Sequence, residues 1–328
     1  MRFALLAMLA LSMCGAALAQ SYPNTDNFGV EVDRNSDWYQ ACMRVEKLAP
    51  PPAEAAAKCD ASGVYYSKLD QAVTSGAEWA AVRSCALVSG DTAVLSMLYA
   101  NGLGVPRDTA IATNYVCRTG AAVAEMDARV RHLATLAPGA PYARYDHCDD
   151  ITSGMMGGVC AAIAARRAER VETAFYTRLR AGLPPAQAAA FDRLRKANQA
   201  FAKAHGEQET ARGGSGYAGF VIDAQARETE WLREHLAAFE KGVFSLPPPS
   251  QFAIDDAELN RVFGERMKAK AEPDDFDVAP AAIRSTQRSW LIYRDAWVAF
   301  AALRYPQLPA DSLKALLTQW RIKQLGKI

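Results

Sequence analysis

The sequence predicts an all-helical protein. Alanine is abundant along the chain, and the long alternating runs of Val, Ile and Thr that form half-buried strands are missing. Trp290, Tyr293 and Trp297 fall three and four residues apart, so a helix would carry them on one face. The chain has 328 residues, more than one hydrophobic core usually serves, and we expect two or three domains.

The first residues have the pattern of an export signal. Arg2 gives a positive start, residues 3–13 are mainly apolar, and residues 17–19 form an Ala-x-Ala cleavage site. We expect residues 1–19 to be removed by cleavage after Ala19, which predicts a periplasmic or secreted protein. The alternative is a lipoprotein anchored through Cys14, although the bulky residue before it fits such a site less well. No later segment has the roughly twenty apolar residues of a membrane span.

Charge and cysteine content narrow the partners and the compartment. Cleavage would leave 36 basic and 36 acidic residues, and six of the seven cysteines. A balanced charge without a basic run argues against nucleic acid or anionic lipid as the partner. Six cysteines in an exported chain predict up to three disulfides, and fifteen pairings are open to them. Spacing favours Cys148–Cys160 first, then Cys85–Cys117 and Cys42–Cys59.

Residues 20–147 are expected to form a disulfide-linked region of helical repeats. Helices are predicted at 37–48, 53–73 and 78–88, and a run of three prolines at 50–52 separates the first two. Residues 132–147 are expected to form a loop at the boundary to the next domain.

The stretch at about 91–118 has the pattern of a helical hairpin. Gly102 and Gly104 suit a turn with positive φ, and Asp108 can cap the second helix. Small residues at Ala110 and Ala112 would let the two helices approach closely. The stretch resembles the Sel-one-like repeat, a relative of the tetratricopeptide hairpin, and one clear copy is present.

Two segments follow that each show a three-helix pattern. The first spans 148–242, with helices at about 157–181, 185–211 and 217–241. The second spans 253–328, with helices at about 255–270, 279–303 and 311–325. Asp255 and Glu258 have the spacing of a capping box at the start of the second segment.

The second segment carries a recognisable motif. Leu259-Asn260-x-x-Phe263 is followed at residues 287–296 by Gln-Arg-x-Trp-x-x-Tyr-Arg-Asp-Ala. This pattern resembles the LprI-like family of lysozyme inhibitors, which are exported bacterial proteins. The resemblance implies a three-helix LprI-like bundle in each segment. The first segment is a degenerate copy, because its aromatic residue, Phe201, is displaced by one position relative to the motif.

The motif helix has two interpretations. If it packs in a core, its aromatic face would lie against the helix of Leu259, Val262 and Phe263, and Leu313, Leu316 and Trp320 would close the bundle. Arg294 would then pair with Glu258 or Glu265. If it binds a partner, an inhibitor of a cationic enzyme would also offer acidic residues. The binding candidates are Trp290, Tyr293, Arg294 and Asp295 on this helix, and Asp274, Asp275 and Asp277 before it.

No pattern of residues indicates catalysis. The four histidines lack metal-ligand spacing, and neither a Gly-x-Ser-x-Gly elbow nor a phosphate-binding loop is present. Adjacent acidic pairs are candidates for glycoside hydrolysis by composition alone, and helix capping or loop positions explain them better. These pairs are Asp149-Asp150, Asp255-Asp256 and Asp274-Asp275. We expect no enzyme, no cofactor and no metal site.

Two functions remain. The resemblance implies a cell-envelope binding protein that inhibits lysozyme-type muramidases. The alternative is a non-enzymatic scaffold that holds other periplasmic proteins on the surface of its helical repeats. Both require a protein partner, and the oligomeric state stays open.

Overall fold

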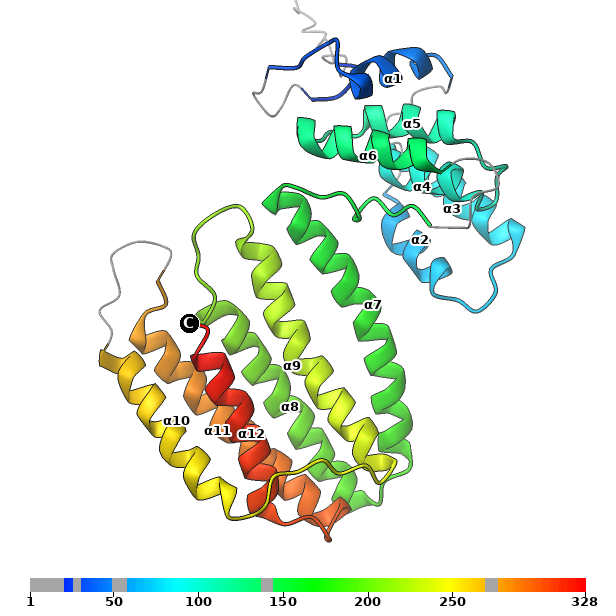
Figure 1. Cartoon of the computed structure of the whole chain (residues 1–328). Coiled ribbons are helices and arrows are strands. Elements are labelled where there is room, and N and C mark those ends of the chain that lie inside the picture. Colours follow the sequence, from blue (N-terminus) through cyan, green and yellow to red (C-terminus); the bar gives the residue numbers. More distant parts are fainter. Residues whose placement is uncertain (1–20, 26–30, 49–57, 137–143, 269–276) are drawn as a thin grey trace, which may run out of the picture.

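The structure is a computed structural model that describes residues 21–25, 31–48, 58–136, 144–268 and 277–328. Within these ranges the chain forms twelve helices and no strand, which confirms the all-helical prediction. Residues 1–20, with the predicted export signal, lie outside the described residues. Figure 1 shows two stacked parts, a smaller one formed by α1 to α6 and a larger one formed by α7 to α12.

The N-terminal part consists of six short helices with its own hydrophobic core. The predicted helix at 53–73 is shorter than expected, since α2 begins only at Ala61 and residues 49–57 lie outside the described residues. Asp60 caps α2 by accepting a hydrogen bond from the backbone N of Gly63 at 2.8 Å. The bounds are α1 (Asp37–Val45), α2 (Ala61–Leu69), α3 (Gly76–Ser89), α4 (Thr92–Asn101), α5 (Thr109–Arg118) and α6 (Val123–Thr135).

The hairpin of α4 and α5 has the predicted turn and cap. Gly102 and Gly104 both have φ of +67°, and a Cβ on Gly104 would lie 2.4 Å from the Cβ of Trp79. The Asp108 carboxylate accepts hydrogen bonds from two backbone N–H groups in the first turn of α5. Ala112 is fully buried between the helices. The relation of this hairpin to the Sel-one-like repeat stays a prediction.

Two of the three predicted disulfide pairings are wrong. Cys42 bonds to Cys117, and Cys59 bonds to Cys85. The prediction joined cysteines by their order along the chain, whereas the packing of α1 against α5 brings together two residues that are 75 positions apart. The contact between α2 and α3 similarly places Cys59 next to Cys85.

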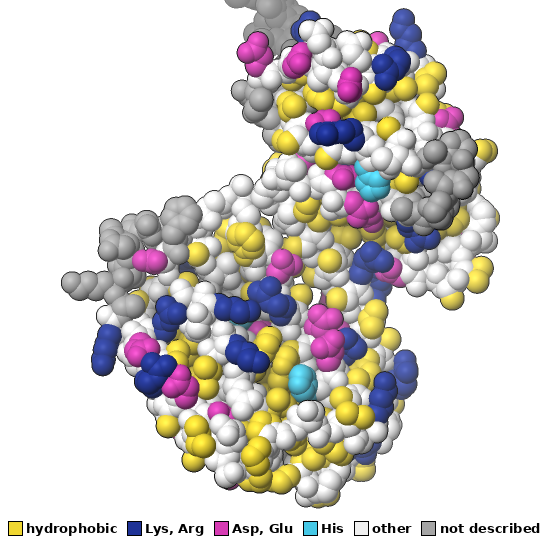
Figure 2. Space-filling view, in the orientation of Figure 1, with side chains coloured by type: hydrophobic (Ala, Val, Ile, Leu, Met, Phe, Trp, Pro, Cys, Tyr) yellow, Lys and Arg dark blue, Asp and Glu magenta, His cyan; other side chains and the backbone are white. Residues whose placement is uncertain are grey.

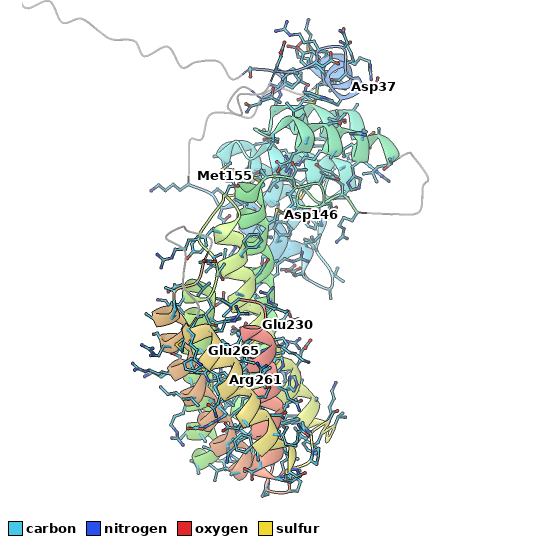
Figure 3. The ribbon with its side chains drawn as sticks, turned by 60° about the vertical axis from the view of Figure 1, so that its left-hand side comes forward. Asp37, Asp146, Met155, Glu230, Arg261 and Glu265 are labelled. Atoms are coloured by element: carbon cyan, nitrogen blue, oxygen red, sulfur yellow. A yellow bond between two sulfur atoms is a disulfide. The ribbon has the colours of Figure 1, made fainter. Side chains whose placement is uncertain are left out.

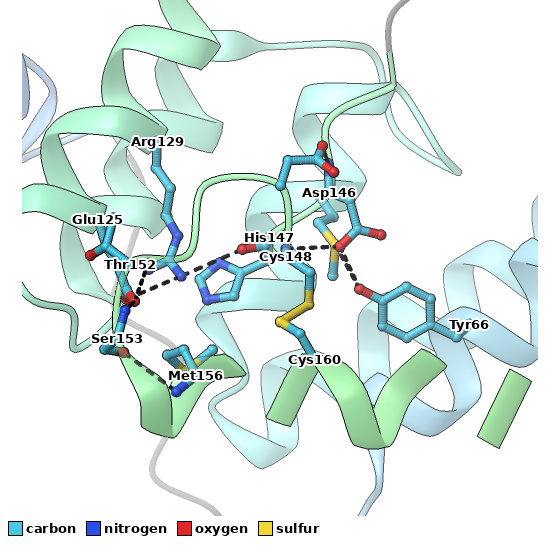
Figure 4. The surroundings of a disulfide bond; sticks show 12 residues. Tyr66, Glu125, Arg129, Asp146, His147, Cys148, Thr152, Ser153, Met156 and Cys160 are labelled. Carbon is cyan, nitrogen blue, oxygen red and sulfur yellow. Dashed lines mark hydrogen bonds and ion pairs between the residues drawn. A yellow bond between two sulfur atoms is a disulfide. The ribbon is translucent and has the colours of Figure 1, made fainter. Parts of the chain in front are cut away.

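The third disulfide lies where the two parts join and matches the prediction. Cys148 bonds to Cys160, which lies in α7 (Gly154–Ala181) and not in a loop. Figure 4 shows how the connecting segment is held on the N-terminal part. Glu125 Oε1 accepts hydrogen bonds from the backbone N atoms of Thr152 and Ser153 at 2.9 and 2.7 Å. Residues 132–135 of the predicted loop at 132–147 belong to α6, which continues to Thr135, and α7 begins at Gly154. Residues 137–143 lie outside the described residues.

A second set of contacts joins α2 to α7 directly. Asp70 at the end of α2 binds Arg167 Nη2 at 2.7 Å and also pairs with Arg170, both from α7. The Tyr66 hydroxyl donates to Asp146 Oδ1 at 2.7 Å. The two hydrophobic cores stay separate, and the joint combines these polar contacts, one disulfide and Ile163 of α7, which packs against the N-terminal core.

The C-terminal part contains six longer helices close to the predicted positions. The main difference is that α10 begins at Gln251, so Asp255 and Glu258 do not form a capping box. Asp255 is instead buried within the helix, where it accepts hydrogen bonds from Gln251 and Gln319, each at 2.9 Å. The helices after α7 are α8 (Pro185–Gln208), α9 (Tyr217–Glu240), α10 (Gln251–Lys268), α11 (Pro280–Arg304) and α12 (Ala310–Leu325).

One aromatic core spans both three-helix segments. Trp290, Tyr293 and Trp297 are all buried, as the packing interpretation predicts. The main neighbour of α11 is α8 from the first segment. The contact with α10, which was the expected packing partner, is smaller. Tyr293 stacks on Phe201 with 5.6 Å between ring centroids, and Trp297 meets Phe239 edge to face at 5.5 Å.

Two of the disulfides lie within the N-terminal part, and the third joins it to the start of α7, so we expect them to stabilise the N-terminal part and this joint. In the chain-entropy model, the longer loop closed by Cys42–Cys117 is worth about 4.5 kcal/mol and that of Cys148–Cys160 about 3 kcal/mol. Reduction should therefore lower the unfolding temperature of the N-terminal part, while α8 to α12, which lack cysteines, keep their transition in a thermal melt followed by circular dichroism. Peptide mapping without reduction checks the pairing, and a peptide linking Cys42 to Cys59 would contradict it.

Truncating Trp290 should destabilise the C-terminal part strongly. Replacing a fully buried aromatic by alanine typically costs about 3–5 kcal/mol, so Trp290→Ala should lower the free energy of unfolding by that amount. The control is Ile292→Ala on the same helix, where the side chain is 65% exposed and a change within about 0.5 kcal/mol is expected. Urea denaturation of both variants measures the difference, and equal stabilities would refute the packing described here.

Candidate functional site

The structure separates the predicted binding residues of α11 into buried and exposed ones. Trp290 and Tyr293 are buried, so neither contacts a partner in this conformation. Burial also raises the pKa of the Tyr293 hydroxyl well above its usual value. Asp295 is exposed, and Arg294 is partly exposed beside it. Only the latter two candidates of this helix are available at the surface.

The predicted pairing of Arg294 with an acidic residue of α10 is wrong. Its guanidinium lies 5.3 Å from the centre of the Trp290 ring and binds Asp295 at 3.0 Å. Glu258 and Glu265 both pair with Arg261 of their own helix, each at 2.6 Å. Figure 3 shows Arg261 and Glu265 together on α10. These residues occupy the outer side of α10, whereas Leu259 lies on the buried side that joins the core.

The outer face of α11 combines apolar and charged side chains. We use this name for Arg288, Leu291, Ile292 and Asp295, all of which are exposed. Leu291 and Ile292 lie between the buried Trp290 and Tyr293 in sequence. They still point outward, because consecutive helical residues point about 100° apart. An exposed apolar pair in the middle of the motif helix gains nothing from folding of the chain alone. This face is therefore available for a partner.

The structure describes only some of the acidic residues that were predicted to bind a partner. Asp274 and Asp275 lie outside the described residues, and Asp277 is exposed just before α11. Asp150 lies 2.8 Å from the His132 ring nitrogen, and Asp149 accepts a hydrogen bond from the backbone of Asp146. The Asp149-Asp150 pair thus serves local structure in the joint. In Figure 2, acidic and basic side chains are interspersed over the visible surface.

A buried ion pair, which the sequence analysis missed, lies next to the motif helix. Arg321 of α12 and Glu209 after α8 are both fully buried, and their two contacts measure 2.6 and 2.8 Å. Gln287, the first residue of the motif, accepts a third hydrogen bond from Arg321 Nε at 2.8 Å. The motif glutamine thus positions a charge from the third helix of the segment.

A second buried carboxylate, Glu228 of α9, extends this network. It accepts hydrogen bonds from Gln324 Nε2 at 2.6 Å and Trp320 Nε1 at 3.1 Å, and its Oε1 lies 3.0 Å from His205 Nδ1. One sequence signal could have found the network. Arg321 falls four residues after Leu317 and four before Leu325, on the helix face that the apolar pattern assigns to the core.

A pocket of about 320 Å³ opens beside this network. Both carboxylates near it are already held by donors of the protein, so the arrangement suits structure and binding better than proton transfer. Among the described residues, no cluster of His, Cys, Asp and Glu is arranged to hold a metal ion. No helix in the described part of the chain is long and apolar enough to cross a membrane. The charged and aromatic residues lining the pocket include His205, Arg227, Trp320, Lys323 and Lys327.

Breaking the buried ion pair should be costly. Arg321→Met would leave the Glu209 carboxylate buried without its partner, which typically costs about 3–5 kcal/mol. Arg304→Met is the matched control, because the Arg304–Glu240 pair is partly exposed and should be worth less than about 1 kcal/mol. Urea denaturation compares the two, and a smaller loss for Arg321→Met than for the control would contradict a structural role.

Comparison with known proteins gives one assignment. Residues 250–325, which run from just before α10 to the end of α12, match the family model described as Lysozyme inhibitor LprI. No curated protein and no solved structure matched the chain. The matched segment contains the Gln287–Asp295 motif and the Arg321 side chain that Gln287 binds. Residues 250–325 of this chain are therefore similar to the LprI lysozyme inhibitor family.

Proposed function

We propose that this chain is an exported cell-envelope protein that binds and inhibits a lysozyme-type muramidase. The observation that carries the proposal is the family match over residues 250–325, which covers three complete helices that contribute to the C-terminal core. The three disulfides support an oxidising compartment outside the cytoplasm, as the predicted export signal does. The chain would act by occupying its target and not by any reaction of its own.

The outer face of α11 is the surface we assign to the target. Interfaces are centred on apolar side chains that exclude water, and Leu291 and Ile292 supply such a centre. Asp295 is 66% exposed at its side chain and lies one turn after them. Lysozymes are commonly basic, so a carboxylate next to an apolar contact complements them. Asp295 contacts the largely covered Arg294, whose side chain is 16% exposed, and its own carboxylate stays accessible to a partner cation.

Acidic residues before α11 would add electrostatic steering. Asp277 is exposed, and the sequence places Asp274 and Asp275 close to it along the chain. Charges at the edge of an interface chiefly change the rate of association, and salt weakens their effect. The zero net charge of the cleaved chain means that this steering would be local.

The alternative proposal is a periplasmic scaffold. It is favoured by the N-terminal part, whose six helices have their own core and lie outside the family match. In this function α1 to α6 would hold another envelope protein, and the LprI domain would be a structural attachment. This proposal keeps the predicted domain boundaries, one between residues 147 and 148 and the other between residues 242 and 253.

Inhibition should depend on the outer face of α11. Ile292→Ser should weaken inhibition in a turbidity assay by at least about tenfold, because losing a central apolar contact costs more than about 1 kcal/mol. Val171→Ser is the matched control, since Val171 is 62% exposed on α7 and lies outside the family match. Replacing Asp274, Asp275 and Asp277 by Asn should slow association more than it changes dissociation.

Two outcomes would count against inhibition. Several lysozymes that stay fully active at micromolar excess of the cleaved chain would end this proposal and leave the scaffold. Equal losses for Ile292→Ser and Val171→Ser would remove the assignment of the surface while keeping the activity.

A further inference from the structure

The Cys148–Cys160 disulfide borders an open groove between the first turns of α7 and α9. The groove has a volume of about 450 Å³, and both cysteines line it. By contrast, Cys42 and Cys117 are fully buried in the N-terminal core, whereas Cys59 and Cys85 are half-buried, as Cys148 and Cys160 are. Thiol–disulfide exchange requires a thiolate to reach a sulfur atom, so solvent access decides which disulfide reacts. In Figure 4 the disulfide lies between the connecting segment and α7.

Glycines keep the groove open. The helices cross closely at Gly158 and Gly219, where a Cβ on Gly219 would lie 3.3 Å from the backbone N of Gly158. A Cβ on Gly157 would meet nothing within 4 Å, so this position of α7 has open space beside it. The helices therefore approach without large side chains between them, and the half-buried disulfide lies beside the crossing.

Apolar side chains line the groove. Phe220 of α9 is 59% exposed and contributes to the lining together with Ala161 and Ala164 of α7. Ile151 lines the groove from the connecting segment. Grouped exposed apolar residues mark an interaction surface, and here they lie around a reducible bond. The combination indicates a partner that brings a reactive thiol to an apolar docking surface.

We propose that this groove docks a dithiol oxidoreductase of the cell envelope, which exchanges with the Cys148–Cys160 disulfide. A thiolate of the partner attacks one sulfur of the bond, which forms a mixed disulfide and releases the other cysteine as a thiolate. The second thiol of the partner then displaces the chain. The products are two cysteine thiols here and one disulfide in the partner. This inference goes beyond the proposed inhibition and does not depend on it.

Opening this bond releases one of the few ties of the joint. The disulfide connects α7 to the segment that Glu125 holds on the N-terminal part. Once reduced, that segment stays attached through hydrogen bonds alone, and the two parts are held less rigidly. Thiol–disulfide exchange at the groove thereby loosens the connection between the LprI domain and the N-terminal part.

Differential alkylation of the full cleaved chain tests accessibility. Timed reduction with dithiothreitol, followed by alkylation and peptide mass spectrometry, should show Cys148 and Cys160 modified at least about tenfold faster than Cys42 and Cys117. Equal rates, or faster reduction of either other disulfide, would overturn the proposal.

A comparison of two reductants tests docking. Phe220→Ser should slow reduction by a purified thioredoxin-type dithiol oxidoreductase at least about threefold, while reduction by dithiothreitol stays unchanged. Val171→Ser, at an equally exposed apolar residue farther along α7, should change neither rate. If Phe220→Ser slows both reductants alike, or neither, the groove is not a docking surface.

Discussion

The packing of α11 against α8 is the contact on which the C-terminal half depends. The motif helix buries Trp290, Tyr293 and Trp297, and the rings that receive the last two come from α8 and α9. The family match begins only at residue 250, so the matched helices do not enclose their own aromatic face. The preceding segment completes this core through α8 and α9.

Sequence periodicity predicted the helices because their apolar spacing is local information. The same spacing predicted that Trp290 is buried. Disulfide pairing could not be predicted this way, because the partner of Cys42 is set by how α1 lies on α5, across 75 residues. The short Cys148–Cys160 loop was predictable, since few conformations separate residues 12 positions apart.

In the candidate site too, local features were predictable from the sequence, whereas contacts between distant residues were not. The sequence groups Tyr293 and Asp295 together as binding candidates, whereas the structure buries Tyr293 and exposes Asp295. The core-facing position of Arg321 was readable from the sequence, but its partners were not, since they come from α9, the start of α11 and the residue after α8. Arg294 was expected to lock α10 to α11. Arg321 joins the helices instead, because it donates hydrogen bonds to both Gln287 and Glu209.

The joint between the two parts has no apolar core of its own. Asp70 and its partners Arg167 and Arg170 are all partly exposed, so water and dissolved ions reach them. Such pairs weaken as ionic strength rises, whereas the two cores on either side are nearly insensitive to it. The relative orientation of the two parts is thus the feature of the molecule that changes most easily. A rise in salinity therefore loosens this joint before it disturbs either folded core.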